Sequence, residues 1–187
     1  NSNDENAIII HDASVANQYY QALCRDFTEL GGIPCVAPPC PGGNSIFVSS
    51  ARGSSYQWQV NTGNGFSNIA DNANYSGSTS ANLTLINPPA NWYGYTYRCF
   101  ADGNKYSDTT TLKFTAYWNG STSSDWFNTA NWNCGVLPHS NTDVIINAGV
   151  TYFPLINSNT TCRSVTLNKN TVAAILSGVQ LILSGAQ

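Results

Sequence analysis

The chain has few charged residues, no methionine and only two histidines, and each shortage excludes something. Charged residues make up 9% of the 187 positions, against about 25% in a typical soluble protein. Seven Lys and Arg residues spread along the chain form no basic patch, so we expect no nucleic-acid partner. No apolar run reaches the roughly 18 residues that a membrane span needs. The lack of Met predicts a processed or excised segment, with any secretion signal outside it.

Six cysteines are the strongest compositional signal. They are Cys24, Cys35, Cys40, Cys99, Cys134 and Cys162. An even count, no Cys-x-x-Cys spacing and few histidines favour disulfides over zinc. Three isolated acids, Asp108, Asp125 and Asp143, do not form the carboxylate cluster of a calcium site. We therefore expect no metal and no cofactor, and we place the protein outside the cytosol, secreted or on the cell surface.

The first 42 residues predict one small unit and a linker. Residues 1–32 begin with a strand at 7–10, and Asp12 then caps a helix whose apolar face recurs at three- and four-residue spacing. Gly31 and Gly32 end that helix. Since one strand and one helix cannot form a core, this unit must pack on another domain. Residues 33–42 contain four prolines and form a stiff linker.

Residues 43–116 show the alternation of half-buried strands. Tyr56, Trp58 and Val60 share one face of a strand, and residues 62–65 (Thr-Gly-Asn-Gly) predict a hairpin. Leu83 and Leu85 mark a further strand. About seven short strands at regular spacing predict a two-sheet β-sandwich.

The sequence pattern changes in residues 117–187. Short apolar strands recur at 144–146, 165–167, 174–176 and 181–183, with Ser-Gly between and after the last two. This regular recurrence of short apolar strands predicts the start of a parallel β-solenoid. An uncapped solenoid end exposes strand edges, so polymerisation or docking by strand addition stays open. The fold class we predict is mainly β, with a sandwich followed by a short solenoid-like module.

The sandwich region resembles an immunoglobulin-like domain. Cys40, Trp58 and Cys99, with Tyr97 two residues before Cys99, match the immunoglobulin core pattern. The motifs Tyr-Gln-Trp-Gln and Gly-Tyr-x-Tyr-Arg-Cys resemble those of the Ig-like repeats of large secreted Bacteroidetes proteins. The resemblance implies that Trp58 packs on an inter-sheet disulfide and that Tyr97 makes the corner hydrogen bond. Cys40 departs from the pattern, because it precedes the strand rather than lying in it.

Two further resemblances frame this region. The pattern of Trp118, Trp126 and Trp132 before Asp-Val-Ile-Ile is similar to a module of surface proteins in the same bacteria. Residues 1–12 resemble the end of a phospholipase D superfamily domain, just after its second His-x-Lys motif, which this chain lacks. That resemblance implies that Glu5 would hydrogen-bond a catalytic histidine supplied from outside the chain. His11 and His139 lack the required lysine two residues later.

Six cysteines allow many pairings, and the resemblance selects one set. The immunoglobulin bridge would be Cys40–Cys99. Cys134–Cys162 would lie wholly within residues 117–187. This leaves Cys24–Cys35, which would link the linker to the helix.

Aromatic clusters suggest a further role. Trp92 and Tyr93, with Tyr95, are candidate glycan contacts, and the alternative is that they cover the base of the sandwich. The three tryptophans of the third region are more typical of a structural plug than of a sugar platform.

We predict a non-catalytic spacer or adhesin-like segment of a large secreted or surface protein. Its partners would be other domains of that protein and a surface glycan or protein. The alternatives are the C-terminal part of a secreted phospholipase D-like phosphodiesterase or nuclease, and carbohydrate binding.

Overall fold

The computed structural model describes residues 39–185, and this part of the chain is mainly β. It contains fifteen strands and two single-turn 3₁₀ helices, η1 (Ala90–Trp92) and η2 (Thr129–Asn131). The prediction of a mainly β fold is therefore confirmed. The predicted strand and helix of residues 1–32, Glu5, Cys24 and Cys35 lie outside the described residues, as does most of the predicted linker.

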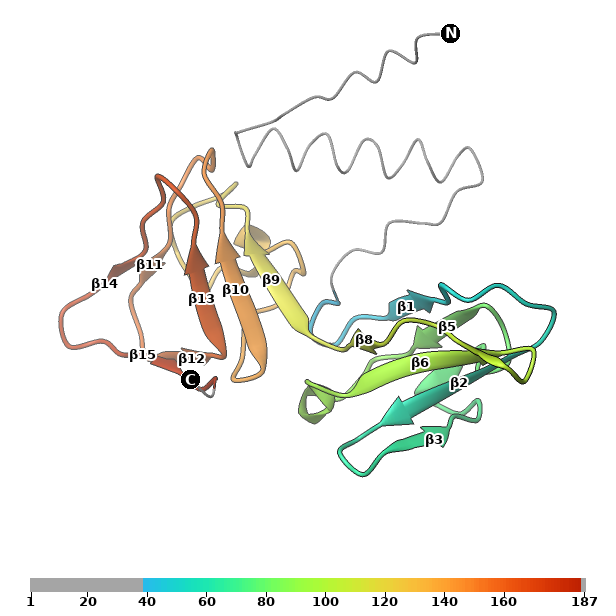
Figure 1. Ribbon diagram of the computed structural model, residues 1–187. Helices are drawn as coiled ribbons and strands as arrows, with labels where there is room; N and C mark the ends of the chain where they lie inside the picture. The colour runs from blue at the N-terminus through green and yellow to red at the C-terminus, as the bar shows by residue number, and fades with distance from the viewer. Residues whose placement is uncertain (1–38, 186–187) are drawn as a thin grey trace, which may run out of the picture.

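Two antiparallel sheets form what we call the antiparallel unit, on the right of Figure 1. The first sheet has the order β1 (Ser45–Val48), β5 (Asn82–Leu85), β4 (Tyr75–Ser76). The second has the order β3 (Phe66–Asn68), β2 (Tyr56–Asn61), β6 (Thr96–Ala101), β7 (Lys105–Tyr106), and β8 (Thr110–Thr111) also pairs with β6. The hairpin predicted at residues 62–65 joins β2 to β3, where Asn61 lies opposite Phe66.

The two sheets share one hydrophobic core. Trp58 on β2 lies opposite Cys99 on β6, and both side chains are buried. Leu83 and Leu85 from the facing sheet join the same cluster. Because alternate residues of a strand point to one face, β6 buries Tyr97, Cys99 and Ala101 and turns the residues between them outward.

The remaining strands are all parallel and form what we call the parallel unit. One sheet has the order β9 (Phe114–Trp118), β10 (Thr142–Ile146), β13 (Ser164–Leu167). Two smaller sheets pair β11 (Leu155–Ile156) with β14 (Ala174–Ile175), and β12 (Thr160–Cys162) with β15 (Leu181–Leu183). In Figure 1 the chain winds around this unit in three passes, which we number by residues: first 114–133, second 142–162, third 164–185.

Successive passes stack in register. Asp143 and Ser164, Asn147 and Asn168, and Asn159 and Gln180 are each joined by a hydrogen bond across 21 residues of sequence. Their side chains therefore form columns through the unit. One interior column is Trp118, Ile146 and Leu167.

Three tryptophans fill the first pass. Trp118, Trp126 and Trp132 are at most 2% exposed, and their ring centroids lie 4.7–6.3 Å apart. The indole of Trp118 donates to the carbonyl oxygen of Tyr152, and that of Trp132 to the carbonyl oxygen of Trp126. This burial agrees with a structural plug and leaves these rings no open face for a sugar.

Strand β9 connects the two units. Phe114, at its start, belongs to the core of the antiparallel unit, whereas Ala116 and Trp118 belong to the core of the parallel unit. The strand therefore runs across the predicted boundary at residue 116. Two cores in contact through one continuous strand bring side chains of both units together at this point.

Candidate functional site at the junction of the two β units

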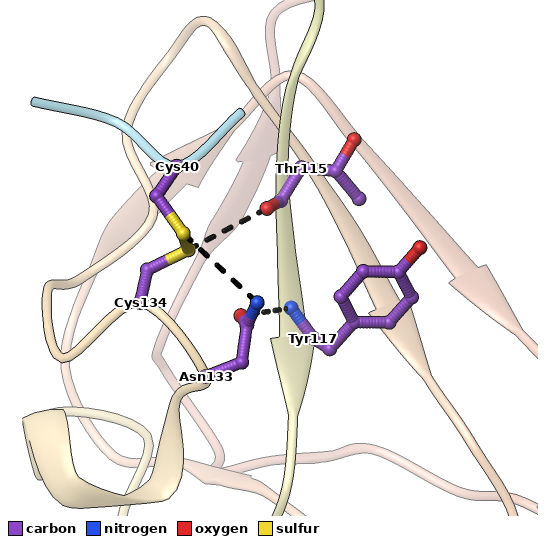
Figure 2. Close-up of a disulfide and its surroundings, with 5 residues drawn as sticks. All are labelled: Cys40, Thr115, Tyr117, Asn133 and Cys134. Atoms are coloured by element: carbon purple, nitrogen blue, oxygen red, sulfur yellow. Dashed lines mark hydrogen bonds between the residues drawn. A yellow bond between two sulfur atoms is a disulfide. The ribbon is translucent and has the colours of Figure 1, made fainter. Parts of the chain in front are cut away.

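A disulfide between Cys40 and Cys134 closes the junction (Figure 2). The two cysteines are 94 residues apart in sequence, one before β1 and the other after η2. The predicted Cys40–Cys99 and Cys134–Cys162 pairs are therefore wrong. Cys99 and Cys162 are free thiols.

The positions of the four cysteines explain the error. Cys99 points into the core from the middle of β6, and Cys162 points into the interior of the parallel unit from β12, so both are buried. The chain at Cys40 instead runs beside β9, where the backbone N–H of Thr115 donates to the carbonyl oxygen of Pro39. Burial raises the pKa of the Cys99 thiol and, with Asp143 adding to the effect, that of Cys162 to about 11. Neither thiol is activated at neutral pH.

The disulfide also covers the outer edge of β9. Sγ of Cys134 lies 3.6 Å from the carbonyl oxygen of Thr115. The side-chain oxygen of Asn133 accepts from the backbone N–H of Tyr117 (Figure 2). The carbonyl oxygen of Tyr117 in turn accepts from the N–H of Asn133. On the side of β9 away from β10, the N–H of Thr115 and both backbone groups of Tyr117 are thus hydrogen-bonded, and the disulfide sulfur shields the carbonyl oxygen of Thr115. These contacts protect an edge that would otherwise pair with another strand.

A polar cluster forms the second contact between the units. The Tyr93 hydroxyl, from the antiparallel unit, donates to Oδ2 of Asp143 on β10 at 2.6 Å. Oδ1 of Asp143 accepts from Arg163 at 2.9 Å and from the hydroxyl of Ser164. The Arg163 guanidinium lies over the Tyr93 ring, 4.4 Å from its centroid, a distance typical of a cation–π contact.

Protonation in this cluster is biased toward the hydrogen-bonded forms. Burial raises the pKa of Asp143, but the hydrogen bonds from Ser164, Tyr93 and Arg163 together outweigh it and leave that pKa below its usual range. Burial, followed by the hydrogen bond to Asp143, raises the pKa of Tyr93 to about 12. At neutral pH the cluster therefore holds an ionised Asp143 and a neutral Tyr93, the states that the bond between them requires.

Two smaller contacts extend the junction. The Asn141 side chain donates to the carbonyl oxygen of Ala90 at 2.8 Å. The rings of His139 and Phe114 meet edge to face, and burial lowers the pKa of His139. His139 is therefore part of the packing between the units, and its Nδ1 accepts from the N–H of Asn141.

The predicted site residues lie in different places. Trp58 and Tyr97 are in the core, and the Tyr97 hydroxyl bonds the Tyr75 hydroxyl at 3.2 Å, in place of the expected corner bond. Trp92 stacks with Tyr75 and Tyr95, packed against the core. Tyr93, the other candidate glycan contact, has its hydroxyl engaged by Asp143.

The described residues were compared with the requirements of a metal site and of a membrane-spanning helix. Within 39–185, His, Cys, Asp and Glu side chains do not gather in threes that could hold a metal ion. Neither short helix of this range has the length and hydropathy needed to cross a membrane. Between the two β units, the junction residues provide a disulfide, hydrogen bonds from Tyr93 to Asp143 and from Asn141 to Ala90, and the contact of Arg163 with the Tyr93 ring.

Sequence reasoning missed Asp143, Arg163 and Ser164 as one cluster. A signal for part of it exists, because residues 143–147 (Asp-Val-Ile-Ile-Asn) and 164–168 (Ser-Val-Thr-Leu-Asn) repeat with the 21-residue spacing of the stacked passes. Aligning that repeat places Asp143 beside Ser164. Nothing local indicates Tyr93, which reaches Asp143 across 50 residues.

Residues 117–186 match the family described as Domain of unknown function (DUF8693). No curated protein and no solved structure matches the chain. The matched range begins within β9 and includes the other strands of the parallel unit.

Proposed function

We propose that this chain is a non-catalytic structural and interaction segment, a spacer or adhesin-like part of a large secreted or cell-surface protein. The junction carries the proposal. The Cys40–Cys134 disulfide and the hydrogen bond from Tyr93 to Asp143 join the two units on either side of β9. Such bonds resist bending between the two units. A stalk requires this stiffness, whereas catalysis does not.

The fold supports a modular assignment. We interpret the antiparallel unit as an Ig-like sandwich, because two sheets share a core around Trp58, Tyr97 and Cys99. We interpret the parallel unit as a short β-solenoid, because three passes stack in register. Both are folds that extracellular proteins use in series. An intramolecular disulfide is compatible with an oxidising, extracellular location.

Orientation of the two units provides the first test. Residual dipolar couplings of backbone amides report one alignment tensor for both units if the junction is rigid. We expect one tensor for the unmodified chain, and two for a variant that combines Cys40→Ser, Cys134→Ser and Tyr93→Phe. Tyr152→Phe, a tyrosine change in the parallel unit, serves as the control and should retain one tensor. Two independent tensors in the unmodified chain would refute the rigid spacer.

Activity provides the second test. Under the phosphodiesterase alternative, Glu5 would act with a histidine from outside the chain, so the 187-residue protein should hydrolyse no phosphodiester above background. Measurable turnover of bis(p-nitrophenyl) phosphate that purification does not remove would contradict the non-catalytic assignment. A glycan array checks the carbohydrate alternative: binding that Trp92→Ala abolishes without unfolding would support it.

A further inference from the structure

The outer face of the sheet β3–β2–β6–β7 carries a cluster of aromatic and polar side chains around one arginine, Arg98 on β6. Because side chains alternate along a strand, burial of Trp58 on β2 and Cys99 on β6 turns the residues on either side of them away from the core. The strand pairings then bring side chains of all four strands together on this face. We call it the Arg98 face and define it by six residues: Gln59, Phe66, Asn68, Arg98, Phe100 and Tyr106.

Aromatic rings hold the guanidinium of Arg98. Its central carbon lies 4.0 Å from the ring centroid of Phe66 and 4.0 Å from that of Tyr106. The Tyr106 ring in turn stacks on Phe100, with the centroids 4.5 Å apart. The strands of this sheet contain no Asp or Glu, and no carboxylate within residues 39–185 lies within ion-pair distance of Arg98. The guanidinium is therefore fixed by cation–π attraction, and its charge is not matched by an acid of the described chain.

Hydrogen bonds across the Arg98 face leave it rich in donors. Nε of Arg98 donates to Oε1 of Gln59 at 2.8 Å, and Nε2 of Gln59 donates to Oδ1 of Asn68 at 2.8 Å. Both amide oxygens are therefore engaged. The terminal N–H groups of Arg98 and the amide N–H groups of Asn68 donate to no residue within 39–185. A positively charged surface with free donors is complementary to an anion.

An exposed ring beside these donors favours a sugar as the carrier of the negative charge. Tyr106 is 53% exposed although it stacks on Phe100. A pyranose presents an apolar C–H face that can pack on such a ring, and its hydroxyls can accept from neighbouring amides. A carboxylate on the same sugar matches the planar fork of Arg98. A peptide strand would instead add to a sheet edge, whereas these side chains lie on a sheet face.

We propose that the Arg98 face binds an acidic polysaccharide built from hexuronic acid units. Arg98 binds the carboxylate through its terminal N–H groups, the Tyr106 ring packs against the pyranose, and Asn68 donates to a hydroxyl. The proposal rests on the interaction role within the proposed function, for which it names a site and a ligand class. It does not depend on the stiffness of the junction, and Trp92 and Tyr93 are not part of the site.

NMR titration of the full 187-residue chain tests the binding. The probes are the trimers of galacturonate, mannuronate and guluronate, and the control ligands are their methyl esters, which lack the charge. We expect at least one trimer to shift the backbone amides of β2, β3, β6 and β7. Its methyl ester should bind at least about tenfold more weakly, because an ester cannot form a charge-assisted hydrogen bond with Arg98.

Substitutions on the Arg98 face should weaken this binding selectively. Arg98→Gln removes the charge and Tyr106→Ala removes the ring, so each should raise the dissociation constant of the trimer at least about tenfold. Arg52→Gln removes the same charge from an exposed position between β1 and β2, and as the matched control it should leave the constant unchanged. The amide shifts of the unmodified chain keep the test decisive if a variant fails to fold.

Four results would overturn the proposal. They are the absence of binding by all three trimers, amide shifts centred outside β2, β3, β6 and β7, a methyl ester that binds as tightly as its acid, and tri-glutamate that binds this face more tightly than any trimer. None of these results would alter the single alignment tensor expected for a rigid junction. Conversely, two tensors would refute the rigid spacer and leave the trimer titration unchanged.

Discussion

Removing the Cys40–Cys134 bridge is the sharpest perturbation of the junction, and its effect can be worked out from the structure. The double variant Cys40→Ser, Cys134→Ser opens a loop of 94 residues that contains the whole antiparallel unit. Closing a loop of that length restricts the unfolded chain by about 16 cal/mol/K, or about 4.7 kcal/mol at 25 °C in the chain-entropy treatment. We expect the free energy of unfolding to fall by about 3–5 kcal/mol, since loss of contacts at the β9 edge and relaxation of the unfolded chain act in opposite directions.

Urea denaturation followed by tryptophan fluorescence measures this change. With a slope of about 2 kcal/mol/M, the midpoint should move down by about 2 M. Cys99→Ala serves as the control for the pairing: proteolytic mass mapping without reductant should still find the Cys40 peptide linked to the Cys134 peptide. Under the pairing implied by the immunoglobulin pattern, the same change would instead release Cys40.

Two results would refute the reasoning. A loss of stability below about 1 kcal/mol in the double variant would mean that the bridge does not constrain the chain as a long loop. A Cys40–Cys99 linkage in the unmodified chain would mean that the edge of β9 is not covered by the disulfide.

Two further predictions concern backbone space and pH. Gly120 and Gly135 both have positive φ, but a Cβ at Gly120 would lie 2.1 Å from the carbonyl oxygen of Tyr152, whereas at Gly135 nothing lies within 4 Å. Gly135→Ala should therefore cost about 1–2 kcal/mol and Gly120→Ala clearly more, and equal urea midpoints would contradict this. With the pKa of Tyr93 at about 12 in the folded protein and about 10 unfolded, the unfolded chain loses its proton first, so stability should fall from about pH 10 to about pH 12. Tyr93→Phe should lack this part of the fall, and identical pH profiles of the urea midpoint would show that the hydroxyl bond to Asp143 is not formed.

Strand positions were the most predictable part of the fold. Alternation around Trp58 and the glycine-rich turn after Asn61 led directly to β2 and its hairpin. The runs at 165–167 and 181–183 likewise became β13 and β15. These signals are local, because the alternation of side chains along a strand and the conformational freedom of glycine at a turn depend only on residues close together in sequence. β11, with two residues, has too short a pattern to be recognised.

Pairings between distant residues were not predictable in the same way. The immunoglobulin pattern suggested Cys99 as the partner of Cys40, yet a disulfide needs Cα atoms a few ångströms apart, and that distance depends on where β9 carries the chain. The Cα atoms of Cys40 and Cys134 lie 5.5 Å apart only because the segment around Pro39 runs beside Thr115. The junction cluster has the same origin, since Tyr93 and Asp143 meet across the two units.

Composition, strand periodicity and turn chemistry thus determined by themselves that this is a mainly β protein with disulfide chemistry, few charges and a repeating C-terminal half. Tertiary structure alone decided which cysteines join and what covers the outer edge of β9. The physical reason is that hydrophobic alternation says which face of a strand is buried but not which strand lies beside it. A disulfide, an ion pair or an uncovered edge exists only once distant parts of the chain have been placed side by side.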